Sequence, residues 1–193
     1  MCREQLPVWQ EFYSNHSDAN VEVVTVAIAA QGAAKARPYV QRANATFTTL
    51  VDEANLLSGL FGFKAAPNGL LVDEQGVLVY RKYGGFDIRK AEYVSLVEEW
   101  LRNPSAEWLA SRMEEDTVGG SQHKAAIAYF RRGLELYSAA NVLGALAEWK
   151  KGSDLEPDNW VIRKQIWAVE QPDKFYNGDV DYDWQREQVR KGI

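Results

Sequence analysis

Pro67 lies in the stretch that most constrains how this chain can fold. An apolar segment ends at Gly62, and Pro67 precedes a mostly apolar run at 69–74. A second such run at 77–82 follows the polar turn that ends at Gly76. Because proline has no backbone N–H for a neighbouring strand, Pro67 belongs at the start of the first run and not inside it. The pattern predicts a loop containing an X-Pro bond, a strand, a tight turn and a second, antiparallel strand.

The first hundred residues alternate between helical and strand patterns. Apolar side chains recur at helical spacing in residues 2–16, where Pro7 either kinks the axis or lies in the first turn. Residues 21–29 are rich in β-branched side chains and almost continuously apolar, which is typical of a strand buried on both faces. The remaining patterns predict helices at 33–43, 55–61 and 89–101 and a strand at 46–51. The order is a parallel βαβ half followed by an antiparallel ββα half.

Three residues carry a resemblance to a known family. Cys2 and Pro7 are five residues apart, and Pro67 stands much later at the start of a strand. Together with the element order, this resembles the thioredoxin fold in its TlpA/ResA-like or AhpC/TSA-like redoxin branch. In that family a Cys-x-x-Cys pair opens a helix, a proline follows the second cysteine by five residues, and a cis-proline loop lies opposite. The resemblance covers residues 1–102, and it implies a three-layer α/β sandwich.

The departure from the family concerns the start of the chain. Cys2 is the only cysteine, so this chain cannot form an intrachain disulfide. The family's first strand and its first, nucleophilic cysteine have no counterpart in the sequence. We therefore expect a redoxin truncated inside its own Cys-x-x-Cys motif, inactive by itself in dithiol turnover.

The resemblance implies roles for three residues. Cys2 would be the resolving cysteine, Pro67 the cis-proline, and Ala66 the residue whose backbone pairs with an incoming peptide. A thiolate at a helix N-terminus is stabilised by the helix dipole, so we expect a lowered pKa for Cys2. The alternatives are a bystander cysteine at the chain end and a trans proline that merely starts a strand. A cis X-Pro bond costs only about 0.5–1 kcal/mol.

The second half of the chain is helical in pattern. Residues 103–122 read as a linker, and 123–193 as an all-α domain with a polar, aromatic-anchored tail. Residues 126–159 resemble a single tetratricopeptide repeat (TPR), with Gly133 and Ala145 where its two helices must approach closely. A lone repeat cannot bury its own apolar face, so it must dock onto the first half, another repeat or another chain.

Composition narrows the set of partners. A net charge of −5 and scattered basic residues argue against nucleic acid, and no apolar run reaches the ~18 residues of a membrane span. His16 and His123 are isolated in the sequence, and no glycine-rich phosphate loop occurs, so we expect neither a metal site nor a cofactor. No signal peptide is visible. The family resemblance nevertheless implies a bacterial setting, either in the cell envelope or extracytoplasmic.

Two functions remain open from the sequence. One is a thiol-disulfide oxidoreductase domain of antioxidant type, fused to a TPR-like module, whose substrates would be a disulfide-bearing protein, a small thiol or a peroxide. The other is a redox-dead thioredoxin-like scaffold whose helical half binds a protein partner. The residues for the second reading are Trp149, Trp160 and Trp167, which either pack between helices or form a peptide-binding face.

Overall fold

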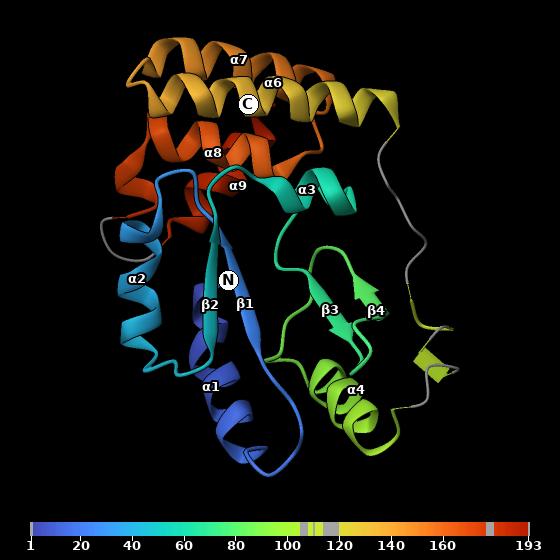
Figure 1. Cartoon of the computed structure of the whole chain (residues 1–193). Helices are drawn as coiled ribbons and strands as arrows, with labels where there is room; N and C mark the ends of the chain where they lie inside the picture. Colours follow the sequence, from blue (N-terminus) through green and yellow to red (C-terminus); the bar gives the residue numbers. More distant parts are fainter. Residues whose placement is uncertain (1, 105–107, 110, 114–119, 177–179, 193) are drawn as a thin grey trace.

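The computed structural model describes residues 2–104, 108–109, 111–113, 120–176 and 180–192 of the chain (Figure 1). The elements of the first half are η1 (Arg3–Gln5), α1 (Leu6–Asn15), β1 (Val24–Ile28), α2 (Ala33–Arg42), β2 (Thr48–Asp52), α3 (Leu56–Phe61), β3 (Gly69–Val72), β4 (Leu78–Lys82) and α4 (Ala91–Arg102). Those of the second half are α6 (Ser121–Ser138), α7 (Val142–Leu155), α8 (Trp160–Glu170), η2 (Pro172–Lys174) and α9 (Tyr182–Arg190).

The four described strands form two separate two-stranded sheets. β1 pairs with β2 in parallel, with Val24 opposite Thr48, and β3 pairs with β4 antiparallel, with Gly69 opposite Lys82. Both predicted strand pairings are therefore confirmed, and the fold is α/β. The single sheet implied by a three-layer sandwich is not found among the described strands, because no described strand lies between the two pairs to connect them.

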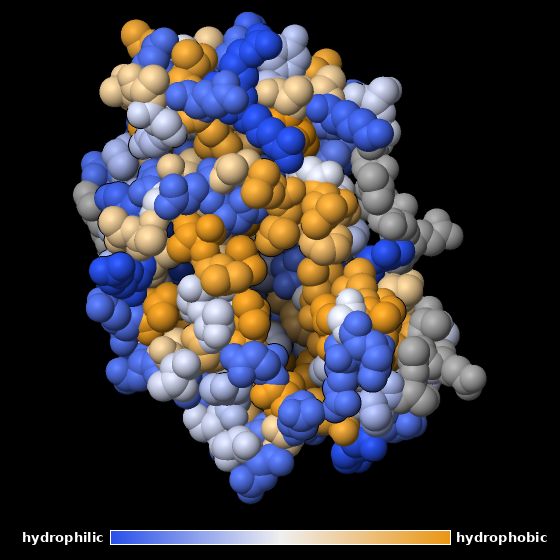
Figure 2. Space-filling model, in the orientation of Figure 1, coloured by the Kyte–Doolittle hydropathy of each residue, from blue (hydrophilic) through white to orange (hydrophobic). Residues whose placement is uncertain are grey.

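β1 is not buried on both faces, and this corrects the prediction from its continuous apolar run. Val24 and Val26 alternate onto one face of the strand and are 51% and 39% exposed, and Leu50 on β2 is 53% exposed. A large part of each of these side chains is therefore open to solvent. Figure 2 shows apolar side chains gathered around a hollow in the middle of this view of the molecule.

The core of the first half lies between α1, β3, β4 and α4. It consists of buried Phe12, Leu71, Val79, Tyr80, Phe86, Leu96, Val97 and Leu109. Gly69 is required in this core, because a Cβ there would lie 2.4 Å from the Phe86 ring. Leu109 comes from the segment predicted as a linker, where it is fully buried and completes the core. The rest of that linker is only partly within the described residues, and 114–119 lie outside them.

The second half is built on the antiparallel pair α6 and α7. Trp149 on α7 is fully buried and its indole Nε1 donates a hydrogen bond of 3.0 Å to the carbonyl of Phe130. A Cβ on Gly133 would lie 2.2 Å from that same nitrogen, so the close approach of the helices depends on this glycine. Ala145 is also fully buried. The two small residues therefore lie where helix packing requires them.

The helical half docks onto the first half through a buried polar cluster. The Lys64 ammonium is 2.8 Å from the Glu156 carboxylate, and the backbone N–H of Val161 donates to the Lys64 carbonyl at 3.1 Å. His123 contacts Glu156 through Nδ1 at 2.9 Å and the Ser58 carbonyl through Nε2 at 3.2 Å. Of the three docking partners considered from the sequence, the first half is the one the structure shows. We call these five residues the joint.

Candidate functional site

A cavity of about 190 Å³ lies where the two halves meet. Ile28, the last residue of β1, and Glu53, which follows β2, line it from one side. The cavity is therefore at the carboxyl ends of two parallel strands, the edge at which open α/β sheets usually bind ligands. Cys2 and Ala66 both line it. The structure thus brings together two of the residues singled out in the sequence, although they are far apart along the chain.

Cys2 stands directly before η1, which continues into α1. Pro7 lies in the first turn of α1, which settles the alternative left open for it. Cys2 as a residue is exposed, but the surrounding cavity removes water from its thiol, and this burial raises the pKa of Cys2 above its ordinary value. The charges of Lys164 and Arg3 lower the pKa in part. The expected lowering by the helix N-terminus is therefore wrong, because desolvation of the thiolate outweighs it.

Arg3 fixes the backbone beside Cys2. Its guanidinium donates to the Phe175 carbonyl at 2.7 Å and to the Tyr39 hydroxyl at 2.5 Å, and it stacks over the Tyr39 ring at 3.9 Å. Phe175 belongs to the tail of the second half, whereas Tyr39 is on α2. Residues from both halves therefore hold the start of the chain against the cavity.

The loop before β3 presents Ala66 to the cavity. The Ala66–Pro67 peptide bond is cis in the structure. The Asn68 amide holds the loop, since its Nδ2 donates to the Ala65 carbonyl at 2.9 Å and its Oδ1 accepts from the Gly84 backbone N–H at 2.7 Å. The side chain of Ala66 adds no polar group, so this wall offers a ligand only backbone and a methyl group.

The opposite wall comes from α8, and sequence reasoning did not anticipate it. Val161, Lys164, Gln165 and Ala168 line the cavity, spaced along one face of that helix. Burial lowers the pKa of Lys164, while the nearby Cys2 raises it. Lys164 and Gln165 are polar residues on this face, and nothing in the sequence pointed from them to Cys2.

Three side-chain amides of this cavity have buried nitrogens without a hydrogen-bond partner among the described residues. They are Gln31 Nε2, Asn55 Nδ2 and Gln165 Nε2. Asn55 is only 1% exposed, and its Oδ1 accepts a 2.6 Å hydrogen bond from the Ser58 hydroxyl. An unsatisfied buried donor costs about 1–3 kcal/mol, so three of them in one cavity form an unusual group.

A carboxylate also lines the cavity. Glu53 follows β2 and supplies a carboxylate at an exposed position of the cavity lining. Nothing in the sequence indicated that the β2–α3 loop and α8 lie on the same cavity.

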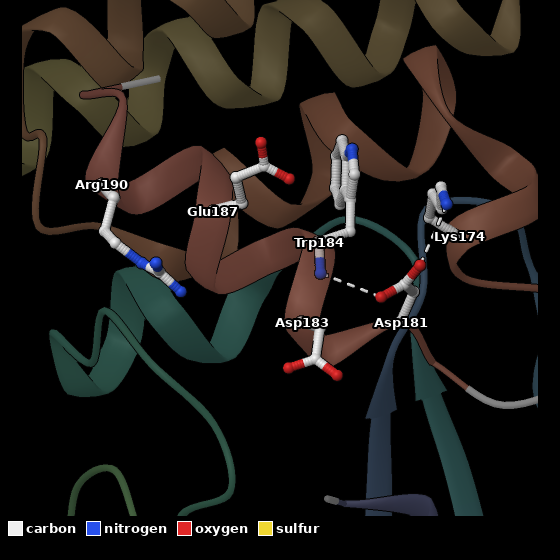
Figure 3. Close-up of a pocket in the computed structure, with 6 residues that line it drawn as sticks. All are labelled: Lys174, Asp181, Asp183, Trp184, Glu187 and Arg190. Atoms are coloured by element: carbon white, nitrogen blue, oxygen red, sulfur yellow. Dashed lines mark hydrogen bonds and ion pairs between the residues drawn. The ribbon is translucent and has the colours of Figure 1, made fainter.

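A second, open groove lies in the tail and is lined by Lys174, Asp181, Asp183, Trp184, Glu187 and Arg190 (Figure 3). Asp181 is 2.9 Å from the Lys174 ammonium, and it accepts a 2.9 Å bond from the Trp184 backbone N–H at the start of α9. The charges of Asp181 and Lys174 are therefore used in contacts within the tail itself. No residue predicted as functional lines this groove, so we place the site at the Cys2 cavity.

The described part of the chain contains no group of three histidine, cysteine or acidic side chains that is arranged to hold a metal ion. Within the same residues, no helix combines the length and the apolarity needed to cross a membrane.

Comparison with known proteins gives one match. Residues 1–96 match the family model described as Redoxin. No curated protein and no solved structure matches the chain. The matched segment includes Cys2, both sheets and the Ala66–Pro67 loop, and it ends within α4, before the helical half begins.

Proposed function

Since residues 1–96 form a redoxin domain of the thioredoxin-like α/β class, we propose that this chain takes part in thiol-disulfide exchange through Cys2. The observation that carries the proposal is that Cys2 and Ala66 line one cavity. The Cys2 sulfur and the Ala66 backbone are thereby available to the same bound substrate.

Cys2 has the role of a resolving thiol in this proposal. Its thiolate attacks one sulfur of a disulfide held in the cavity, a new S–S bond forms, and the other sulfur leaves as a thiol. Because Cys2 is the only cysteine of the sequence, the disulfide that it attacks and the thiol that later releases it belong to other molecules. The raised pKa of Cys2 keeps the thiol largely protonated near neutral pH and makes this step slow there.

Ala66 and Pro67 would receive the substrate. The loop held by Asn68 leaves the Ala66 backbone beside the cavity with no competing side-chain donor. An extended peptide could pair with that backbone while its disulfide sulfur lies against Cys2, which is the usual way that exposed backbone adds affinity for a peptide.

The helical half suggests the alternative of a redox-dead scaffold. The close packing of α6 on α7 at Gly133 and Ala145 supports the TPR-like interpretation and the division into a redoxin domain at 1–102, a linker and a helical domain at 123–193. In this alternative the helical domain binds a protein partner and Cys2 has no exchange role.

Mass spectrometry of mixed disulfides tests the proposal. A peptide containing a strained disulfide should add once to the native chain, and Cys2→Ser should abolish the addition. Ala66→Arg, which fills the cavity beside the thiol, should slow addition at least tenfold while leaving the far-ultraviolet spectrum unchanged. Ala139→Arg, at an exposed helix end remote from the cavity, is the matched control. No addition to the native chain would favour the scaffold, and equal rates in Ala66→Arg and the control would show that the cavity takes no part in the exchange.

A further inference from the structure

We propose that the cavity beside Cys2 binds the carboxylate arm of a small disulfide, and that α8 of the helical half supplies half of this binding site. The inference rests on the proposed exchange role of Cys2 and adds to it the class of substrate. The helical half is then part of the substrate site and not only an appended module.

The unpaired donors identify the chemistry of the ligand. Gln31 Nε2, Asn55 Nδ2 and Gln165 Nε2 are all buried, lack an acceptor among the described residues, and belong to residues that line one cavity. A carboxylate presents about four lone-pair sites and accepts several such bonds at once, as few other small groups do.

Charge favours the same ligand. Lys164 lines the cavity and has no ion pair with another described residue, although its side chain is close enough to Cys2 for the two groups to influence each other's pKa. A cation that is partly removed from water is favourable only with an anion nearby. Glu53 is the carboxylate among the lining residues, at an exposed position. The ammonium of Lys164 is therefore available to a ligand in the cavity.

Size limits the ligand to a short arm. Since a water molecule occupies ~30 Å³ in the liquid, a cavity of about 190 Å³ accommodates roughly six water-sized groups. This corresponds to a short mercaptocarboxylate arm and excludes a folded protein. The apolar residues of the wall, Ile28, Val161 and Ala168, suit the methylene groups of such an arm.

The reaction balances without another reagent. Cys2 loses its proton, its sulfur attacks one sulfur of R–S–S–R, and the S–S bond of the ligand breaks. One R–S group stays on Cys2 as a mixed disulfide, and the other leaves with the bonding electrons and takes up a proton as R–SH. Cys2 is oxidised and one half of the ligand is reduced.

Two small disulfides of opposite charge test the site. The rate of mixed-disulfide formation on Cys2 is measured by intact mass with 3,3′-dithiodipropionate and with cystamine, in the native chain and in the chain unfolded in guanidinium chloride. For each disulfide we divide the rate in the native chain by the rate in the unfolded chain. We expect this ratio to be about tenfold higher for dithiodipropionate than for cystamine. Lys164→Gln should remove most of this preference, whereas Lys124→Gln, an exposed lysine on α6 that does not line the cavity, should retain it.

A binding measurement tests the carboxylate site independently of disulfide exchange at Cys2. In Cys2→Ser, dithiodipropionate should raise the melting temperature, and the added substitution Lys164→Gln should abolish that increase. If the native-to-unfolded rate ratio is the same for both disulfides, or if dithiodipropionate does not change the melting temperature, the proposed carboxylate site is wrong. Exchange through Cys2 still stands in that case. If the Cys2→Ser chain binds the ligand but native Cys2 reacts with neither disulfide, the proposed exchange function fails instead. A preference for cystamine would assign the cavity to Glu53 and overturn the proposal.

Discussion

The two halves of this chain differ in how completely they bury their own apolar residues. In the helical half Ala126, Ala145, Trp149 and Ile162 are fully buried in one cluster. In the redoxin half, neither β1 nor β2 contributes a residue to the core, and Val24 remains about half exposed. The helical half is thus packed around its own centre, whereas part of the redoxin half leaves apolar side chains about half exposed.

The Cys2 cavity lies at the boundary between these two differently packed halves. The redoxin half supplies the thiol and the Ala66 backbone, but its cavity has one wall only because α8 lies against it. A well-packed helical unit is a rigid support for such a wall, since interiors packed at crystal density deform little. Activity and stability should therefore respond differently to changes in the two halves.

The largest expected effect is in the helical core. Trp149→Ala removes a fully buried ring and its hydrogen bond to Phe130, so the free energy of unfolding should fall by about 3–5 kcal/mol. Urea unfolding followed by circular dichroism measures this loss. A loss below about 1 kcal/mol would show that the helical half is not the better-packed region.

The next effect is at the joint. Glu156→Ala leaves Lys64 and His123 without their shared carboxylate, and we expect a loss of about 1–3 kcal/mol. Asp158→Asn is the matched control, because Asp158 also pairs with Lys64 but is largely exposed. The same urea titration compares the two, and equal losses would contradict the importance of the buried contact.

Acid should weaken the joint as well. Burial alone would raise the pKa of Glu156, but hydrogen bonds from Lys64, Asn159 and His123 outweigh it and hold the pKa below its ordinary value. A carboxylate with a lowered folded-state pKa stabilises the fold above its unfolded-state pKa, and this stabilisation is lost as the pH falls through the folded value. Melting temperatures measured from pH 7 down to pH 3 should fall less steeply for Glu156→Gln than for the unmodified chain.

A smaller effect concerns the reactivity of Cys2. Because burial raises the pKa of the thiol, alkylation by iodoacetamide at pH 7.5 should be slower in the native chain than in the unfolded one, and should increase more steeply at higher pH. Lys164→Gln removes a positive charge that lowers this pKa, so we expect a further decrease of about two- to fivefold at pH 8. A faster reaction of the native chain at pH 7.5 would show that the helix N-terminus dominates after all.

The smallest effect should be on the open face of β1. Val24→Thr and Val26→Thr replace exposed methyl groups in a strand that tolerates threonine, so stability should change by no more than about 0.5 kcal/mol. A loss similar to that of Trp149→Ala would mean that this face is covered in solution, and light scattering would then identify self-association.

Several features were predictable because they depend on neighbours in the sequence. The order of elements, the two strand pairings and the start of β3 just after Pro67 follow from patterns only a few residues long. The small residues Gly133 and Ala145 likewise predicted a closely packed helix pair. In the structure Trp149 lies against Gly133. The apolar run of β1 led to the wrong prediction that both faces of the strand are buried. An apolar sequence shows which side chains tolerate burial, but not whether another element packs over them.

The sequence by itself determined that a thiol opens a helix, that a proline begins a strand, and that a helix pair follows. Only the tertiary structure decided that Lys164 and Gln165 line the same cavity as Cys2, that Asn55 is buried with an unpaired donor, and that the pKa of Cys2 is raised. The reason is physical. Backbone conformation is set mainly by adjacent residues, whereas burial and electrostatic environment are set by segments that meet only after the chain has folded.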